Sequence, residues 1–245
     1  MKKLSPPTSI PSEPVFRGFE GQDFWRVPGY VRHLPHWRLD GATYFVTFRL
    51  ADSIPERIVR RWECEREAWL HAHGILAHWQ KDDAARFYLA LAAVPREERA
   101  AFQRKQSRRF FIELDRCHGC CPLRDPEASR LVSDALLHFH GERVWTGDFV
   151  IMPNHVHVIV QAFPGVTLED WLYSVKRFTS LQMGRKESVA ALVSRRSEHL
   201  WQIESFDRVI RDEAELARTR EYIAKNPRRM KKGEFRLHRA EWPAP

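Results

Sequence analysis

The sequence contains no apolar run near the roughly 18 residues that a membrane-spanning helix requires. Its first seven residues include two lysines, but no apolar segment follows them, so the sequence shows no secretory signal. We therefore expect a soluble, cytoplasmic protein without a membrane partner. Of its 245 residues, 43% are hydrophobic, which is enough to form a core in one large domain or in a domain with an insertion.

Cysteine is also scarce. Cys64 stands alone, and the other three cysteines cluster around His118 in the segment Cys-His-Gly-Cys-Cys, residues 117–121. A structural zinc site normally needs four ligands in two spaced pairs, and the second pair is missing here. The sequence therefore favours free thiols in a reducing compartment over a zinc site.

Acidic residues are fewer than basic residues, 32 against 40, and the positive excess is unevenly placed. Residues 225–239 contain seven Lys or Arg side chains and a single acid, Glu234. No amphipathic apolar face accompanies this charge, which favours a nucleic acid over a membrane as the polyanionic partner. A solvated tail explains the charge equally well at this point.

The first part of the chain predicts an arm, a strand and a helical insertion. Residues 1–30 carry five prolines and few apolar residues, so we expect an extended arm. Residues 41–50 are rich in β-branched and aromatic side chains and predict a strand. Apolar residues at helical spacing over residues 56–109, interrupted near Gly74 and Pro95, predict two or three amphipathic helices inserted after that strand.

The rest of the chain predicts further strands and helices in alternation. Asp125 and Thr167 suit the N-caps of two helices, and Pro153-Asn154 suits a tight turn between two strands. The predicted helices cover residues 125–140, 167–183 and 212–225, and the predicted strands cover residues 143–152, 155–161 and 200–210. Without the insertion, the order is strand, helix, strand, strand, helix, strand and a final helix. We predict an α+β ferredoxin-like plait, an antiparallel sheet with helices on one face.

Two histidines project from one face of the second strand of the predicted hairpin. Side chains alternate between faces along a strand, so His155 and His157 point the same way, while Val156 points to the other face. Two neutral imidazoles placed in this way can each donate a ring nitrogen to one divalent metal ion. A pair of polar side chains on a solvated strand face is the alternative.

Tyr222 and Asn226 lie four residues apart at the end of the last predicted helix, and hence on one helix face. A tyrosine hydroxyl, whose ordinary pKa is near 10, needs a metal ion or a charge nearby to act as a nucleophile. The side-chain oxygen of Asn226 could complete a metal site begun by two histidines. Core packing and a helix cap are the alternative roles of this pair.

Two segments together resemble the single-tyrosine transposases of the HUH class, in particular the REP-associated tyrosine transposases. The segments are Phe-Val-Ile-Met-Pro-Asn-His-Val-His-Val-Ile-Val, residues 149–160, and Glu-Tyr-Ile-Ala-Lys-Asn-Pro, residues 221–227. Supporting segments in the family's order are residues 32–37, 44–49, 176–179, 200–202 and 207–208. The resemblance covers most of the chain and implies a transposase domain over residues 31–227, with the helical insertion inside it.

The resemblance implies a metal-dependent endonuclease and strand transferase. His155, His157 and Asn226 would bind Mg²⁺ or Mn²⁺. Tyr222 would attack a DNA phosphodiester, leaving a 5′-phosphotyrosine link and a free 3′-hydroxyl that can reverse the step. The substrate would be single-stranded DNA whose imperfect palindromes fold into hairpins. The protein would be bacterial and associated with the nucleoid, as a monomer or a homodimer.

Several basic side chains are expected to contact DNA phosphates. They are Arg32, Lys176, Arg177, Arg208, Arg228, Arg229, Lys231 and Lys232. Trp37 and Trp201 could stack on unpaired bases, although core packing is the more ordinary role of each.

Two features depart from the family. The helical insertion is longer than the corresponding connection in compact members, and we expect an added DNA-binding or interaction lobe. After Asn226-Pro227 the family continues with a small apolar segment, whereas residues 228–245 begin here with Arg-Arg-Met-Lys-Lys. We expect a basic C-terminal tail that adds an electrostatic DNA clamp.

Three alternatives remain open. Tyr173 is a rival nucleophile, although the residue four positions later is Arg177 instead of an amide. A second possibility is a protein of the same descent that binds hairpin DNA without cleaving it. The third is a metal-dependent hydrolase that uses the two histidines, with Asp148 as the nearest acidic candidate for a further ligand. The substitution Tyr222→Phe would spare a hydrolase and inactivate a tyrosine recombinase.

Overall fold

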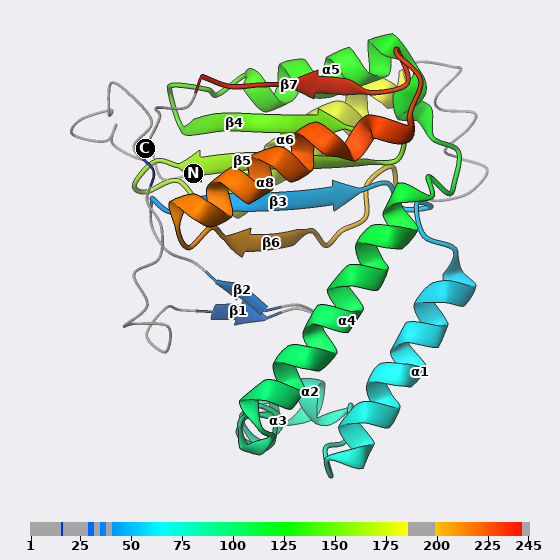
Figure 1. Ribbon diagram of the computed structural model, residues 1–245, viewed down its shortest axis with the longest axis vertical. Coiled ribbons are helices and arrows are strands. Elements are labelled where there is room, and N and C mark those ends of the chain that lie inside the picture. Colours follow the sequence, from blue (N-terminus) through cyan, green and yellow to red (C-terminus); the bar gives the residue numbers. More distant parts are fainter. Residues whose placement is uncertain (1–15, 17–28, 32–34, 38–40, 186–198, 242–245) are drawn as a thin grey trace. The chain divides into compact units, whose positions relative to one another are not determined.

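The computed structural model of the chain describes Phe16 and residues 29–31, 35–37, 41–185 and 199–241 (Figure 1). The chain divides into two compact units. The sheet unit comprises Met1–Asp52 and Cys120–Pro245, and the helical unit comprises Ser53–Gly119. Arg32 and nearly all of the predicted N-terminal arm lie outside the described residues.

The sheet unit is built on one antiparallel sheet of five strands in the order β6-β3-β5-β4-β7. The strands are β3 (Thr43–Arg49), β4 (Val144–Ile151), β5 (His155–Ala162), β6 (Phe206–Val209) and β7 (Arg236–His238). Leaving β7 aside, the elements follow the chain order of a ferredoxin-like plait, so the predicted α+β fold is confirmed. Two short strands, β1 (Gly29–Val31) and β2 (Pro35–Trp37), pair separately with each other.

Helices α5 (Pro126–Leu137) and α6 (Leu168–Gly184) pack on one face of the sheet. Asp125 caps α5 by accepting hydrogen bonds from two backbone N–H groups, and Thr167 caps α6 in the same way from Asp170. Alternate strand residues bury their side chains in this layer, including Val46, Phe48, Phe149, Val156 and Val158, and they pack there with Trp171 of α6 and with Trp201. The period-two pattern therefore directs the apolar half of each strand toward α5 and α6.

Helix α8 (Glu213–Lys225) lies across the other face of the sheet (Figure 1). It begins at Asp212, whose carboxylate accepts a hydrogen bond from the backbone N–H of Glu215, at 2.6 Å. A short 3₁₀ helix, η2 (Asn226–Arg229), follows it directly. The last predicted helix thus covers the face of the sheet opposite α5 and α6, which is the face that carries His155 and His157 (Figure 1).

A register shift in β4 decides which of its residues face α8. Thr146 pairs with Val160, and Phe149 pairs with Val158, so β4 holds one extra residue between these pairs. The shift moves Phe149 into the core on the α5 side and turns Asp148 toward α8.

Two segments of the sheet unit differ from the prediction. The strand predicted over residues 200–210 is limited to an isolated bridge between Trp201 and Leu50 and to β6. Between these two parts, the carbonyl groups of Gln202 and Ile203 accept hydrogen bonds from the Lys176 ammonium, at 2.9 and 3.1 Å. The segment expected as a tail contains β7, which pairs with the edge of β4. A 3₁₀ turn, η1 (Pro122–Arg124), precedes α5.

The helical unit contains four helices where two or three were predicted. They are α1 (Glu56–Ala72), α2 (Trp79–Asp82), α3 (Ala84–Ala93) and α4 (Arg96–Asp115). The unit has its own buried clusters: Leu70, Ile75, Phe87 and Val94 form one, and Ile54, Ile58 and Leu114 form the other. Arg109 of α4 forms an ion pair with Glu65 of α1. No helix among the described residues is long and apolar enough to cross a membrane.

Candidate active site

The predicted histidine pair lies at the start of β5, directly after the hairpin turn. Both side chains are fully buried and face α8. In the β3–β5 ladder, His157 pairs with Thr47, and His155 pairs with Arg49, so both partners share the histidine face. The prediction that the imidazoles point the same way agrees with this register.

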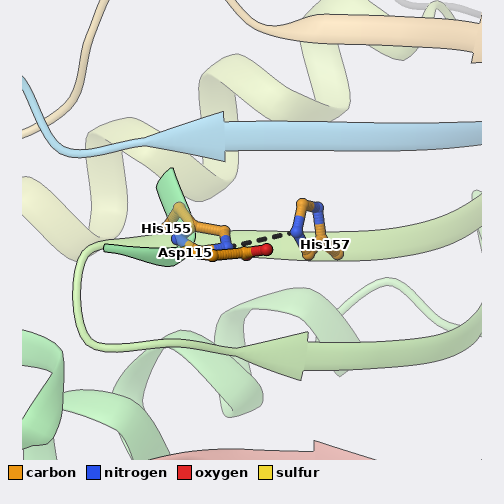
Figure 2. Close-up of side chains that lie close together, drawn as sticks. All are labelled: Asp115, His155 and His157. Atoms are coloured by element: carbon orange, nitrogen blue, oxygen red, sulfur yellow. Dashed lines mark hydrogen bonds between the residues drawn. The ribbon is translucent and has the colours of Figure 1, made fainter. Parts of the chain in front are cut away.

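Each histidine contacts a neighbouring polar side chain through Nδ1, and the two Nε2 atoms face each other. His155 Nδ1 lies 2.7 Å from the Asn154 side-chain oxygen, and His157 Nδ1 lies 2.7 Å from the Thr47 hydroxyl. The two Nε2 atoms are 3.1 Å apart (Figure 2). Asp115, the third side chain labelled in that view, belongs to the helical unit.

Burial keeps both imidazoles neutral. Loss of solvation lowers the pKa of His155 to about 3. The same burial, reinforced by the neighbouring His155, holds the pKa of His157 well below its ordinary value. A neutral imidazole with an Nε2 lone pair is the form that binds a metal ion, and an acceptor behind Nδ1 fixes that tautomer. The Asn154 oxygen can act as such an acceptor for His155.

Tyr222 of α8 reaches this histidine pair. Its hydroxyl lies 3.3 Å from His157 Nε2, and Asn226 Nδ2 donates a hydrogen bond to the same hydroxyl at 3.2 Å. The Phe45 ring stacks on His157 and meets Tyr222 edge-on, with ring centroids 5.4 and 6.0 Å apart. The i, i+4 spacing therefore brings the tyrosine and the asparagine together, as the sequence predicted.

Asp148 fastens α8 to the sheet near the tyrosine. Its buried carboxylate accepts hydrogen bonds from Arg220, with the closer pair of atoms 3.1 Å apart, and forms an ion pair with Arg239 at the same distance. In the hydrolase alternative, Asp148 is the acidic candidate for a further metal ligand. Its engagement by two arginines instead makes it a structural anchor.

Tyr173, the rival nucleophile, lies in α6, on the opposite side of the sheet from α8. Its side chain is largely exposed, whereas its neighbours Trp171 and Leu172 are buried in the core. The structure brings Tyr222, and not Tyr173, to the histidines.

The predicted DNA contacts fall into three groups. Arg32 lies outside the described residues. The Lys176 ammonium donates hydrogen bonds to the backbone carbonyl groups of Gln202 and Ile203. Trp201 is a core residue, and its indole N–H donates a hydrogen bond to the Thr179 hydroxyl at 2.8 Å. The exposed cations are Arg177 on α6 and Arg228, Arg229, Lys231 and Lys232 after α8.

Arg208 is a predicted DNA contact that lies beside the helix of Tyr222. It stands over the Phe45 ring, with its guanidinium carbon 5.3 Å from the ring centroid, and forms an ion pair with Glu215 of α8. Burial and two neighbouring arginines lower the pKa of Arg208, whereas Tyr222 acts on it in the opposite direction. This cation thus ties β6 to the tyrosine helix.

Sequence reasoning missed the residues that support the site. Thr47 and Arg49 become neighbours of the histidines only through strand pairing, which no local pattern specifies. Burial lowers the pKa of Arg49 to about 10. The sequence predicts Asn154 as a turn residue and as part of the motif at residues 149–160, and its position directly before His155 is the one signal of its contact with that imidazole.

The middle of the chain matches a known family. Residues 142–226 match the family model described as "Transposase IS200 like". This segment contains both histidines, Tyr222 and Asn226. The resemblance inferred from the sequence is confirmed for this segment, which is similar to IS200-like transposases.

Other comparisons add little. No curated protein matches the chain. Among solved structures, the chain is similar to one described as a REP-associated tyrosine transposase bound to a REP hairpin. The identity is 11% and the TM-score 0.42, with 81% of this chain and 74% of that chain covered.

Proposed function

We propose that the protein is a metal-dependent endonuclease and strand transferase that cleaves and rejoins hairpin-forming single-stranded DNA through Tyr222. The observation that carries the proposal is the Tyr222 hydroxyl 3.3 Å from His157 Nε2, which is itself 3.1 Å from His155 Nε2. This group lies within the segment that matches the transposase family. A nucleophile and two potential metal ligands therefore meet at one point on the sheet.

The two histidines fit a divalent metal ion. Ligand atoms about 2.1 Å from an ion and at right angles to each other are about 3 Å apart. That distance agrees with the 3.1 Å between the two Nε2 atoms. We propose His155, His157 and Asn226 as the ligands of Mg²⁺ or Mn²⁺, and two nitrogen donors favour Mn²⁺, since Mg²⁺ prefers oxygen. When bound, the ion would offset the negative charge that develops on the scissile phosphate.

The role of Tyr222 is to form the covalent intermediate. Its oxygen would bond to phosphorus while the bond from phosphorus to the 3′ oxygen breaks, and one proton passes overall from the phenol to that 3′ oxygen. The resulting phosphotyrosine conserves a phosphodiester, so the 3′-hydroxyl of another strand can attack it and release the tyrosine. Asn226 and the Phe45 ring hold the phenol where this attack begins.

The remaining features of the proposal follow the resemblance. The substrate is single-stranded DNA with hairpin-forming palindromes, and the protein acts in the bacterial cytoplasm at the nucleoid, as a monomer or a homodimer. The hydrolase alternative is weakened because Asp148, its acidic ligand candidate, is engaged by Arg220 and Arg239. The adduct assay described next distinguishes the proposed enzyme from a protein that binds hairpin DNA without cleaving it.

A covalent-adduct assay tests the proposal. The full chain is mixed with labelled hairpin-containing single strands taken from the flanks of its gene, with Mn²⁺ or Mg²⁺, and resolved on a denaturing gel. We expect a metal-dependent protein–DNA adduct with the native chain and none with Tyr222→Phe. The matched control Tyr173→Phe should form the adduct at the native level, because that side chain lies on α6 and is exposed.

Two results would contradict the proposal. An adduct that persists in Tyr222→Phe and disappears in Tyr173→Phe would move the nucleophile to α6. Tight binding of every flanking strand without any adduct would establish the binding-only alternative.

A further inference from the structure

The segment after the nucleophile helix is a cationic loop with an ordered backbone. Residues 226–235, called here the basic loop, join α8 to β7. Its cations are Arg228, Arg229, Lys231 and Lys232, which are all exposed and form no ion pair with another described residue. The one acid, Glu234, accepts a hydrogen bond from the backbone N–H of Lys231 at 3.1 Å, so it caps the loop's own turn.

Internal contacts fix the shape of the basic loop. Pro227 is buried, and its carbonyl group accepts a hydrogen bond from the backbone N–H of Met230 at 2.8 Å. The Glu234 N–H donates to the Lys231 carbonyl group at 3.1 Å. Gly233, between them, has φ +96°, a conformation that other residues rarely adopt. Four cations are therefore presented on a backbone that needs little reordering to bind phosphates.

Both flanks of the basic loop meet at Asp148. From α8, Arg220 donates two hydrogen bonds to this buried carboxylate, at 3.1 and 3.3 Å. From beyond β7, Arg239 Nε lies 3.1 Å from it, and the Ala240 N–H donates to it at 2.9 Å. Arg220 also donates to the Ala240 carbonyl group at 3.0 Å, which joins the two flanks directly.

The loop and the nucleophile share this anchor because they are adjacent in the chain. Tyr222 lies two residues after Arg220, and its hydroxyl accepts a hydrogen bond from Asn226, the first residue of the basic loop. A DNA strand whose phosphates bind the cations of the loop is held next to the helix that carries Tyr222, because the loop begins where that helix ends. Without Asp148, Arg220 and Arg239 would face each other as like charges with no carboxylate between them.

We propose that the basic loop is a preformed binding surface for the phosphates of single-stranded DNA. We also propose that Asp148 is a positioning residue that couples phosphate binding on the loop to the placement of Tyr222. The proposal rests on the proposed function for the identity of the polyanion. It goes further in assigning the phosphate surface to an anchored loop and in giving Asp148 a role in the reaction.

The first experiment measures DNA binding alone, as anisotropy of a labelled flanking hairpin strand over a range of salt concentrations. Replacing Arg228, Arg229, Lys231 and Lys232 together by Gln should make the slope of log K against log salt shallower by about 3, since each phosphate contact to a single strand contributes about 0.7. The control replaces Arg124, Arg130, Arg143 and Arg218 by Gln, four side chains of the sheet unit that lie outside the basic loop. These side chains are also exposed, and their replacement removes the same charge, so we expect the native slope.

The outcomes of this binding experiment separate the two proposals. A loop-dependent slope without any covalent adduct would sustain the phosphate surface and refute the cleavage chemistry. An adduct with a slope that the loop variant leaves unchanged would refute the phosphate surface. Equal loss of slope in both variants would also refute it, because net charge and not the loop would then attract DNA.

The second experiment tests the coupling through Asp148. Arg239→Gln removes only the cation that reaches Asp148 from beyond β7. Asp148→Asn removes the shared negative charge and replaces one of its two acceptor oxygens by a donor. At saturating DNA, we expect each variant to form the adduct at least about 10-fold more slowly than the native chain. DNA binding should stay within about threefold, and Arg239→Lys should restore part of the rate. Amide hydrogen exchange of the free variants checks that they fold. Exchange in the presence of DNA measures how far bound DNA slows the α8 amides, and we expect this slowing to be smaller in both variants than in the native chain.

The coupling has a clear contrary result. A native rate in Arg239→Gln together with native slowing of α8 exchange by DNA would show that the anchor only stabilises the fold. A parallel loss of DNA affinity and rate in both variants would likewise refute a positioning role.

Discussion

His157 joins three elements at one ring. Its Nδ1 lies 2.7 Å from the Thr47 hydroxyl of β3, and its Nε2 lies near His155 of β5 and Tyr222 of α8. We predict that His157→Ala lowers the rate of adduct formation by about 100-fold or more, since in the proposed function it removes a metal ligand that would act on the phosphate in the transition state. Hairpin affinity should stay within about threefold, because the imidazole does not recognise bases.

The control for that substitution is His71→Ala, an exposed histidine in α1, which should leave both quantities unchanged. Thermal unfolding of each variant checks the cavity left by the buried imidazole. If hairpin affinity falls as far as the rate, the histidine pair is structural and its assignment as a metal ligand fails.

Because both imidazoles are buried, we also predict that the unfolding free energy of the metal-free chain depends on pH. Their pKa values are lowered in the folded state, to about 3 for His155, so between that value and 6.5 the unfolded chain binds more protons than the folded chain. The stabilisation is complete above about pH 6.5 and is lost as the pH falls. Each histidine should contribute up to about 1.4 kcal/mol per pH unit to the decline of the unfolding free energy.

Urea unfolding with a chelator present, between pH 7.5 and 5, measures this slope above the range where most carboxylates titrate. The double variant His155→Gln, His157→Gln should show a flatter profile. A native slope in the double variant would assign the acid sensitivity to other groups.

At the scale of elements, local patterns located the pieces, and remote contacts decided how they are used. The strand, hairpin and caps around Asp125 and Thr167 agree with prediction because each depends on residues within a few positions. Strand β7 escaped prediction because its three residues, Arg-Leu-His, carry no period, and only pairing with β4 makes them a strand.

The candidate site also combines features that local sequence patterns predict with features that depend on remote contacts. Alternation along β5 and the i, i+4 spacing in α8 are local, so the pairs His155/His157 and Tyr222/Asn226 could each be predicted. Their meeting could not, since it depends on the register shift that turns Asp148 toward Arg220, 72 residues later in the chain.

The chain consists of two units with separate cores. The two points at which the sheet unit is interrupted, Asp52 and Cys120, lie close together. The Cys120 N–H donates a hydrogen bond to the Asp52 carboxylate at 2.7 Å, so the chain leaves and re-enters the sheet unit at neighbouring points. An insertion with adjacent ends and its own buried clusters can be excised without stretching the remainder. We predict that replacing residues 53–119 by a short Gly/Ser linker leaves a folded sheet unit.

That shortened chain should still form the Tyr222 adduct, within about 10-fold of the native rate, because the nucleophile, both histidines and the basic loop all belong to the sheet unit. Cooperative thermal unfolding establishes folding, and the denaturing-gel assay measures the adduct. If the shortened chain folds and binds the hairpin but forms no adduct, a group within the helical unit is required for the chemistry. If instead it forms the adduct but binds long single strands more weakly, the unit is the added DNA-binding lobe that its length suggested, because contacts away from the scissile phosphate contribute affinity and not rate.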